Sequence, residues 1–66
     1  MEEILKAIKD AIKAERQAQE HYQMLADKSE DLTVKGFFEQ LVRDEEEHEN
    51  LLRLRYESLS KAWNKI

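Results

Sequence analysis

The sequence predicts an all-α protein: an antiparallel hairpin of two helices, formed by residues 1–66 as a single domain. Three observations predict it: a charged fraction of 39% with only 8% aromatic residues, the lack of any proline, and apolar residues that recur every three or four positions. This composition and spacing are typical of long amphipathic helices rather than strands. A chain of 66 residues has room for one small core at most.

The first helix is expected over about residues 2–28. Nothing in this stretch breaks a helix, and the acidic Glu2 and Glu3 occupy the first turn, where the helix dipole favours negative charge. One apolar stripe follows the helix in alternating steps of four and three, and Glu15 interrupts it. The stripe consists of Ile4, Ile8, Ala11, Ala18, Tyr22 and Leu25. The helix is therefore expected to bury one face along its whole length.

Residues 29–32 form the predicted turn, with Ser29, Asp31 or Thr33 as the N-cap of the second helix. That helix is expected over about residues 32–64. Its stripe is interrupted by Glu45 and His48 and consists of Val34, Phe38, Leu41, Leu52, Tyr56, Leu59, Trp63 and Ile66. So short a connection makes the two helices antiparallel neighbours.

Self-association is predicted because two helices cannot enclose apolar stripes this wide. Small chains usually depend on disulfides, metals or oligomerisation, and the absence of cysteine excludes the first of these. Four helices are the smallest arrangement that closes such a core. The expected partner is a second copy of the chain, in a homodimer or a higher homo-oligomer that forms a four-helix bundle.

Three polar residues lie where the stripes should be apolar: Glu15, Glu45 and His48. A buried carboxylate without a partner is costly, so these positions need an explanation. Position 30, at the centre of the turn, is midway between positions 15 and 45, and His48 is one helical turn beyond Glu45 on the same face. The three side chains are therefore predicted to converge in one layer near the middle of the bundle.

Two copies of this layer would contain four carboxylates and two imidazoles. That is the ligand set of di-iron and di-manganese carboxylate bundles, one Glu from each of two helices and Glu-x-x-His from each of the other two. Four carboxylates also balance the charge of two divalent cations. Oxygen donors with one nitrogen per metal suit iron(II) or manganese(II), while zinc can occupy such a site without redox chemistry. We therefore predict two iron ions per dimer, with Mn or Zn as substitutes.

The acidic run 44–49 offers a simpler interpretation of Glu45 and His48, because acid-rich helices often contain Glu-x-x-His by chance. Within that run only Glu45 and His48 lie on the stripe. The others are expected on a solvated outer face, where Glu46 and Glu49, like Glu20, could guide metal ions and where pairs four residues apart, Arg16–Glu20 and Glu49–Arg53, could form. The alternative that remains is a non-enzymatic helical dimerisation module whose buried polar residues fix its register.

The overall charge narrows the classes of partner. A formal net charge of −4 argues against nucleic acid and anionic membranes, which attract basic surfaces. The acidic start of the chain is unlike a secretion signal, and no apolar run approaches the ~20 residues that cross a bilayer. A cytoplasmic protein is expected. Gly36 inside the second helix would be explained by a close approach of another helix.

Two segments, Ala11 through Glu15 to Tyr22 and Phe38 through Glu45 to His48, resemble the two helices of one half of the rubrerythrin domain, a branch of the ferritin-like superfamily. The resemblance implies that Glu15 bridges the metals and that Glu45 and His48 are terminal ligands. It also implies that Tyr22 belongs to the catalytic centre and lies near the metals without binding them. The half-length chain is similar to encapsulated ferritins, which build ferroxidase sites between two-helix subunits inside a protein shell.

This resemblance implies a ferroxidase-type di-iron oxidoreductase, which binds and oxidises Fe(II) at a dimer interface. The alternative within the family is a rubrerythrin-like peroxide reductase that takes electrons from a separate donor, since the chain lacks the cysteine-rich electron-transfer module. An encapsulating shell and an electron donor are accordingly the further partners to consider.

Overall fold

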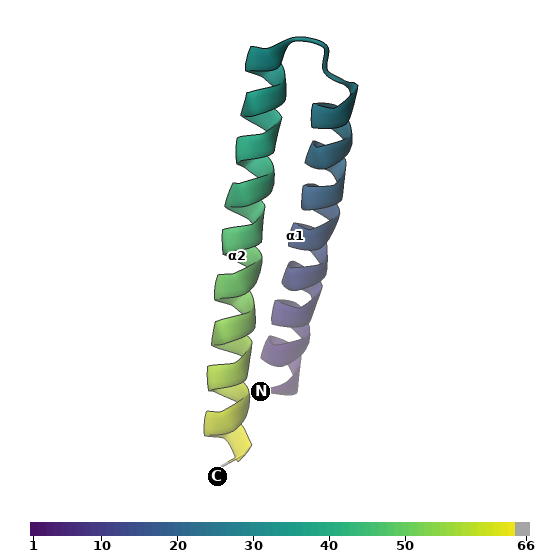
Figure 1. The fold of residues 1–66 in the computed structure, drawn as a ribbon. Coiled ribbons are helices and arrows are strands. Elements are labelled where there is room, and N and C mark those ends of the chain that lie inside the picture. The colour runs from purple at the N-terminus through teal and green to yellow at the C-terminus, as the bar shows by residue number, and fades with distance from the viewer. Residues whose placement is uncertain (65–66) are drawn as a thin grey trace.

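The computed structural model describes residues 1–64 and consists of two long helices joined by a short connection (Figure 1). Helix α1 comprises Glu2–Lys28 and helix α2 comprises Leu32–Asn64. They pack together as an antiparallel hairpin whose Cα extents are 54 × 15 × 10 Å. The predicted all-α hairpin is confirmed. Ile66, predicted as the last member of the second stripe, lies outside the described residues.

The connection between the helices is fixed by Asp31, which is the N-cap of α2. Its carboxylate Oδ1 accepts hydrogen bonds from the backbone N–H groups of Thr33 (2.8 Å) and Val34 (3.0 Å), two donors that have no partner within the helix. On the other side of the turn, the N–H of Ser29 donates to the carbonyl of Ala26 (3.2 Å) and closes the end of α1. Of the three N-cap candidates, Asp31 makes these capping hydrogen bonds.

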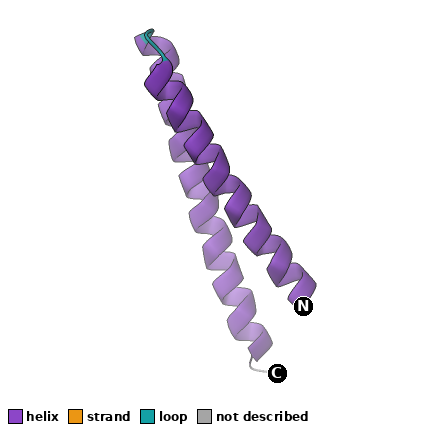
Figure 2. Cartoon of the chain, turned by 90° about the vertical axis from the view of Figure 1, so that its right-hand side faces the viewer, coloured by secondary structure: helices purple, strands orange, loops and turns teal. Residues whose placement is uncertain are grey.

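The interface between α1 and α2 is thin. Among the described residues, the buried apolar side chains are Ala26 and Val42. Large apolar side chains at least two-fifths exposed are Met1, Ile4, Met24, Leu32, Val34, Phe37, Leu51, Leu54 and Trp63. The helices also cross at an angle, so that their free ends separate, as Figure 2 shows. The hairpin therefore leaves much of its apolar surface in water.

Gly36 is not explained by a close helix contact. A Cβ built at this position would meet nothing within 4 Å, so the expected close approach is absent within the hairpin described. As for membranes, neither α1 nor α2, as far as each is described, has an apolar stretch long enough to cross a bilayer.

Candidate metal centre

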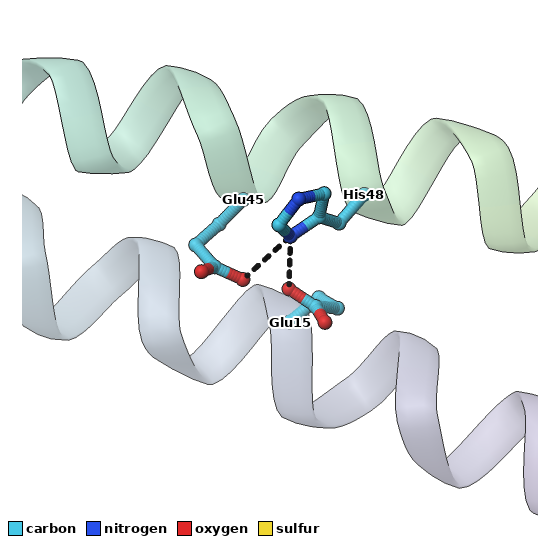
Figure 3. Close-up of side chains that lie close together, drawn as sticks. All are labelled: Glu15, Glu45 and His48. Atoms are coloured by element: carbon cyan, nitrogen blue, oxygen red, sulfur yellow. Dashed lines mark ion pairs between the residues drawn. The ribbon is translucent and has the colours of Figure 1, made fainter.

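Glu15, Glu45 and His48 meet midway along the hairpin, where α1 supplies the first residue and α2 the other two (Figure 3). Each offers one ligand atom, and the three atoms all lie within 4.8 Å of one another. His48 Nδ1 is 3.6 Å from Glu15 Oε2 and 3.5 Å from Glu45 Oε2. The three residues singled out in the sequence are thus brought together.

The carboxylate of Glu15 has an unsatisfied oxygen. Its Oε2 atom is buried and has no hydrogen-bond partner among the described residues. The contacts to His48, at 3.5–3.6 Å, are longer than charge-assisted hydrogen bonds, which lie near 2.7–2.9 Å. An unpaired buried carboxylate oxygen is costly, and a cation is the partner that would offset that cost best. Two carboxylates and one imidazole suit a divalent transition metal, so the residues present fit the implied iron.

The cluster is closed on one side and open on the other. The side chains of Glu15 and Glu45 are 25% and 19% exposed, whereas that of His48 is 59% exposed.

His48 follows Val34 and Leu41 at intervals of seven residues, so these three line one face of α2. Ile4, Ala11, Ala18 and Leu25 form the equivalent seven-residue series on α1. By helical periodicity both series lie on the same side of the hairpin, and the metal cluster opens towards that side.

Next to the cluster lies a third carboxylate, that of Glu49, which is buried. Arg16 donates two hydrogen bonds to it, from Nε to Oε1 and from Nη2 to Oε2, each 3.0 Å long. Gln19 adds a bond of 2.7 Å to Oε1 and Arg53 one of 2.8 Å to Oε2. The side chain of Glu49 is only 7% exposed. We call these four residues the Glu49 network.

The Glu49 network supplies the positive charges that stabilise the ionised form of Glu49. The hydrogen bonds from Arg16, Arg53 and Gln19, in that order of effect, lower the pKa of Glu49 to about 2. Reciprocally, the hydrogen bond and the negative charge of Glu49 raise the pKa of Arg16. Glu49 is therefore an anion whose counter-charges come from the chain itself.

The prediction that Glu49 lies on a solvated outer face is wrong. It is buried against α1 because it is one helical turn beyond Glu45, on a face that turns towards Arg16 and Gln19. The predicted Glu49–Arg53 pair forms, but Arg16 bonds to Glu49 across the hairpin rather than to Glu20. The sequence holds only a weak sign of this burial, because Glu49 follows Glu45 by four residues, a step that also joins stripe positions.

Tyr22 lies half-buried between the helices. Its ring stacks on Phe38, with centroids 6.4 Å apart, and is 5.9 Å from the ring of His21. Within residues 1–64 its hydroxyl forms no hydrogen bond to Glu15 or Glu45. Its part in the site stays a prediction.

The comparison with known families agrees with this geometry. The rubrerythrin family model matches residues 2–64. The chain belongs to the rubrerythrin family. No curated protein and no solved structure gave a match. Rubrerythrin-family proteins typically bind iron. A cluster of two glutamates and one histidine is therefore the kind of site expected in a chain of this family.

Proposed function

We propose that two copies of this chain form a four-helix bundle that binds two iron ions between them and oxidises Fe(II), a ferroxidase-type activity. The observation that carries the proposal is the buried, unpartnered Oε2 of Glu15, which faces Glu45 and His48 across the hairpin. Membership of an iron-binding family supports it. The proposal gives that oxygen the cation that it lacks.

A second copy is part of the proposal because one hairpin offers too few donors. Glu15, Glu45 and His48 amount to two carboxylates and one imidazole, whereas a pair of ions needs shared ligands. Two copies supply four negative charges, which neutralise two divalent ions. The seven-residue apolar series beside His48 supports the same pairing, because burying it would remove exposed side chains such as Ile4 (53%) and Val34 (44%) from water.

In this arrangement each chain's own residues have distinct tasks. Glu15, on α1, lies between the helices and is the carboxylate proposed to bridge two ions. Glu45 and His48 lie one turn apart on α2. In each of the two chains, this pair is proposed to bind one ion. When bound, two Fe(II) ions would each give up one electron to the oxidant, dioxygen or hydrogen peroxide, and become Fe(III). Tyr22, two helical turns from Glu15 on α1, is proposed to limit the access of water from that end.

The direct test is an anaerobic Fe(II) titration of the purified protein, followed by separate pulses of dioxygen and of hydrogen peroxide. We expect saturation near one iron per chain, and optical changes on oxidation. Glu15→Ala should abolish both, whereas the control Glu57→Ala, at an exposed site, should change neither. Absence of saturable binding would refute the metal centre. Fast turnover only with peroxide and a supplied reductant would favour the peroxide reductase of the same family.

The dimer is tested separately by sedimentation. Val34→Glu places a charge on the proposed interface, and Leu54→Glu places one at a site at least as exposed, half a helical turn away around α2. We expect the first variant to weaken both dimerisation and iron binding and the second to leave both intact. Iron binding by a stable monomer would contradict the shared site.

A further inference from the structure

The Glu49 network joins the two helices at the level of the metal cluster. Arg16 directly follows Glu15 on α1, and Glu49 directly follows His48 on α2. The two-pronged bond between Arg16 and Glu49 therefore connects the backbone positions adjacent to two of the proposed ligands. Gln19 adds a second connection, because its Nε2 also donates to the backbone carbonyl of Glu45, at 3.4 Å.

We propose that the Arg16–Glu49 pair is a positioning element that sets the height of α1 relative to α2, and so holds Glu15 within reach of Glu45 and His48 before metal binds. The inference rests on the proposed metal centre. It assigns to residues outside the ligand set the task of aligning that set. These are positioning residues, since they act through the backbone of the ligands.

Apolar packing alone would align the helices poorly. The buried apolar side chains among the described residues are small or medium-sized, Ala26 and Val42. Apolar contacts are non-directional, so a small slide of one helix along the other costs little as long as area stays buried. A guanidinium that donates two parallel hydrogen bonds to one carboxylate is directional, and a slide of a few ångströms breaks both bonds.

The network also keeps Glu49 from competing as a ligand. Its Oε1 accepts from Arg16 and Gln19, and its Oε2 accepts from Arg16 and Arg53, so both oxygens are occupied. Glu49 is next to His48 in sequence, yet it has no free oxygen to offer a metal. The donor set of the hairpin thus stays at two carboxylates and one imidazole.

The test separates alignment from stability with the double variant Arg16→Met/Glu49→Leu. Removing both partners of this half-buried ion pair together leaves neither of the two charges unpaired, so the metal-free melting temperature should fall less than in Glu49→Leu alone. Cobalt(II) affinity, measured by titration of its visible absorption, should fall about tenfold. The matched control Glu57→Leu/Lys61→Met makes the same kind of replacement at an exposed pair four residues apart and should keep the original affinity.

A second readout does not use metal. Spin labels at the exposed positions 13 and 47, one on each helix, report the distance between α1 and α2. We expect a broader distance distribution in the Arg16→Met/Glu49→Leu variant than in the control. Unchanged affinity and an unchanged distribution in a folded variant would overturn the inference alone. Failure of the unaltered protein to bind cobalt would overturn the proposed metal centre, and this inference with it.

Discussion

Two carboxylate layers lie side by side in the middle of the hairpin, and they differ in where their counter-charge comes from. Glu49 is surrounded by Arg16, Arg53 and Gln19 and accepts four hydrogen bonds from them. Glu15, in the neighbouring layer, has a buried oxygen with no hydrogen-bond partner in the part of the chain described. We call the Glu49 layer complete, because the chain itself supplies the counter-charges of this carboxylate. We call the Glu15 layer incomplete, because its buried oxygen has no such partner among the described residues. Only the incomplete layer needs a cation from outside.

The largest expected difference between the layers is in metal affinity. Glu15→Gln should reduce the affinity for manganese(II) by more than about 100-fold, since even residues around a ligand cost 10–100-fold when altered. Glu49→Gln should cost about tenfold or less, because Glu49 acts only through the alignment of the ligands. Isothermal titration of both variants provides the measurement. Equal losses in the two variants would remove the distinction between the layers.

Metal should stabilise the folded protein by binding at the incomplete layer, the one that contains Glu15. With manganese(II) at a hundred times its dissociation constant, the free energy of unfolding should rise by about 2.7 kcal/mol. A chelator should reverse the rise. Urea denaturation measures this, with Glu15→Gln as the variant in which the rise should vanish and Glu57→Gln as the control in which it should persist. A rise that survives Glu15→Gln would place the bound ion elsewhere.

Without metal, the two layers should respond in opposite directions to an apolar replacement. Glu15→Leu removes the unpartnered oxygen and should raise the melting temperature of the metal-free protein. Glu49→Leu leaves the donors of Gln19 and two arginines without their acceptor and should lower it. Circular dichroism in the presence of a chelator reports both. Two shifts of the same sign would show that the layers are alike.

The pH dependence of stability should come from the complete layer. The pKa of Glu49 is lowered to about 2 in the folded state, so this carboxylate favours folding above its ordinary pKa of 4.5. That contribution should be lost progressively as the pH falls from about 5 towards 2, because protonation then removes the acceptor of both arginines. Glu49→Gln should lack this part of the acid sensitivity. Denaturation curves of both proteins at successive pH values give their free energies of unfolding. The difference between the two free energies at each pH is the contribution of Glu49.

The incomplete layer was easier to predict from the sequence than the complete one. Glu15, Glu45 and His48 interrupt apolar stripes, and such interruptions stand out against a helical period. Glu49 lies within an acidic run and has arginines nearby, a pattern that surface helices share, so its burial became visible only once α1 was placed against α2. The hairpin itself followed from the stripes and the single turn signal, with Asp31 as the cap.

Pairings across the hairpin were the part that sequence reasoning could not supply. Arg16 has an acid four residues away in Glu20, and local spacing favours that partner. The bond to Glu49 prevails because it is two-pronged and its acceptor is buried. Its formation depends on the relative height of the two helices, which no local rule sets. The sequence does not fix the height of α1 relative to α2. The role of the Glu49 network in aligning the helices could therefore be inferred only from the structure.

The smallest expected effect belongs to a position outside both layers. Gly36 is exposed inside α2, and an added methyl group would meet nothing within 4 Å. Gly36→Ala should therefore raise the free energy of unfolding by about 0.5–1 kcal/mol, the usual difference in helix propensity. Manganese affinity, measured in the same titrations, should not change. If stability rises while affinity stays constant, the affinity losses in the Glu15 and Glu49 variants cannot be attributed to altered helix stability. A loss of affinity here would mean that any change in α2 disturbs the metal layer, and the contrast between the two layers would lose its force.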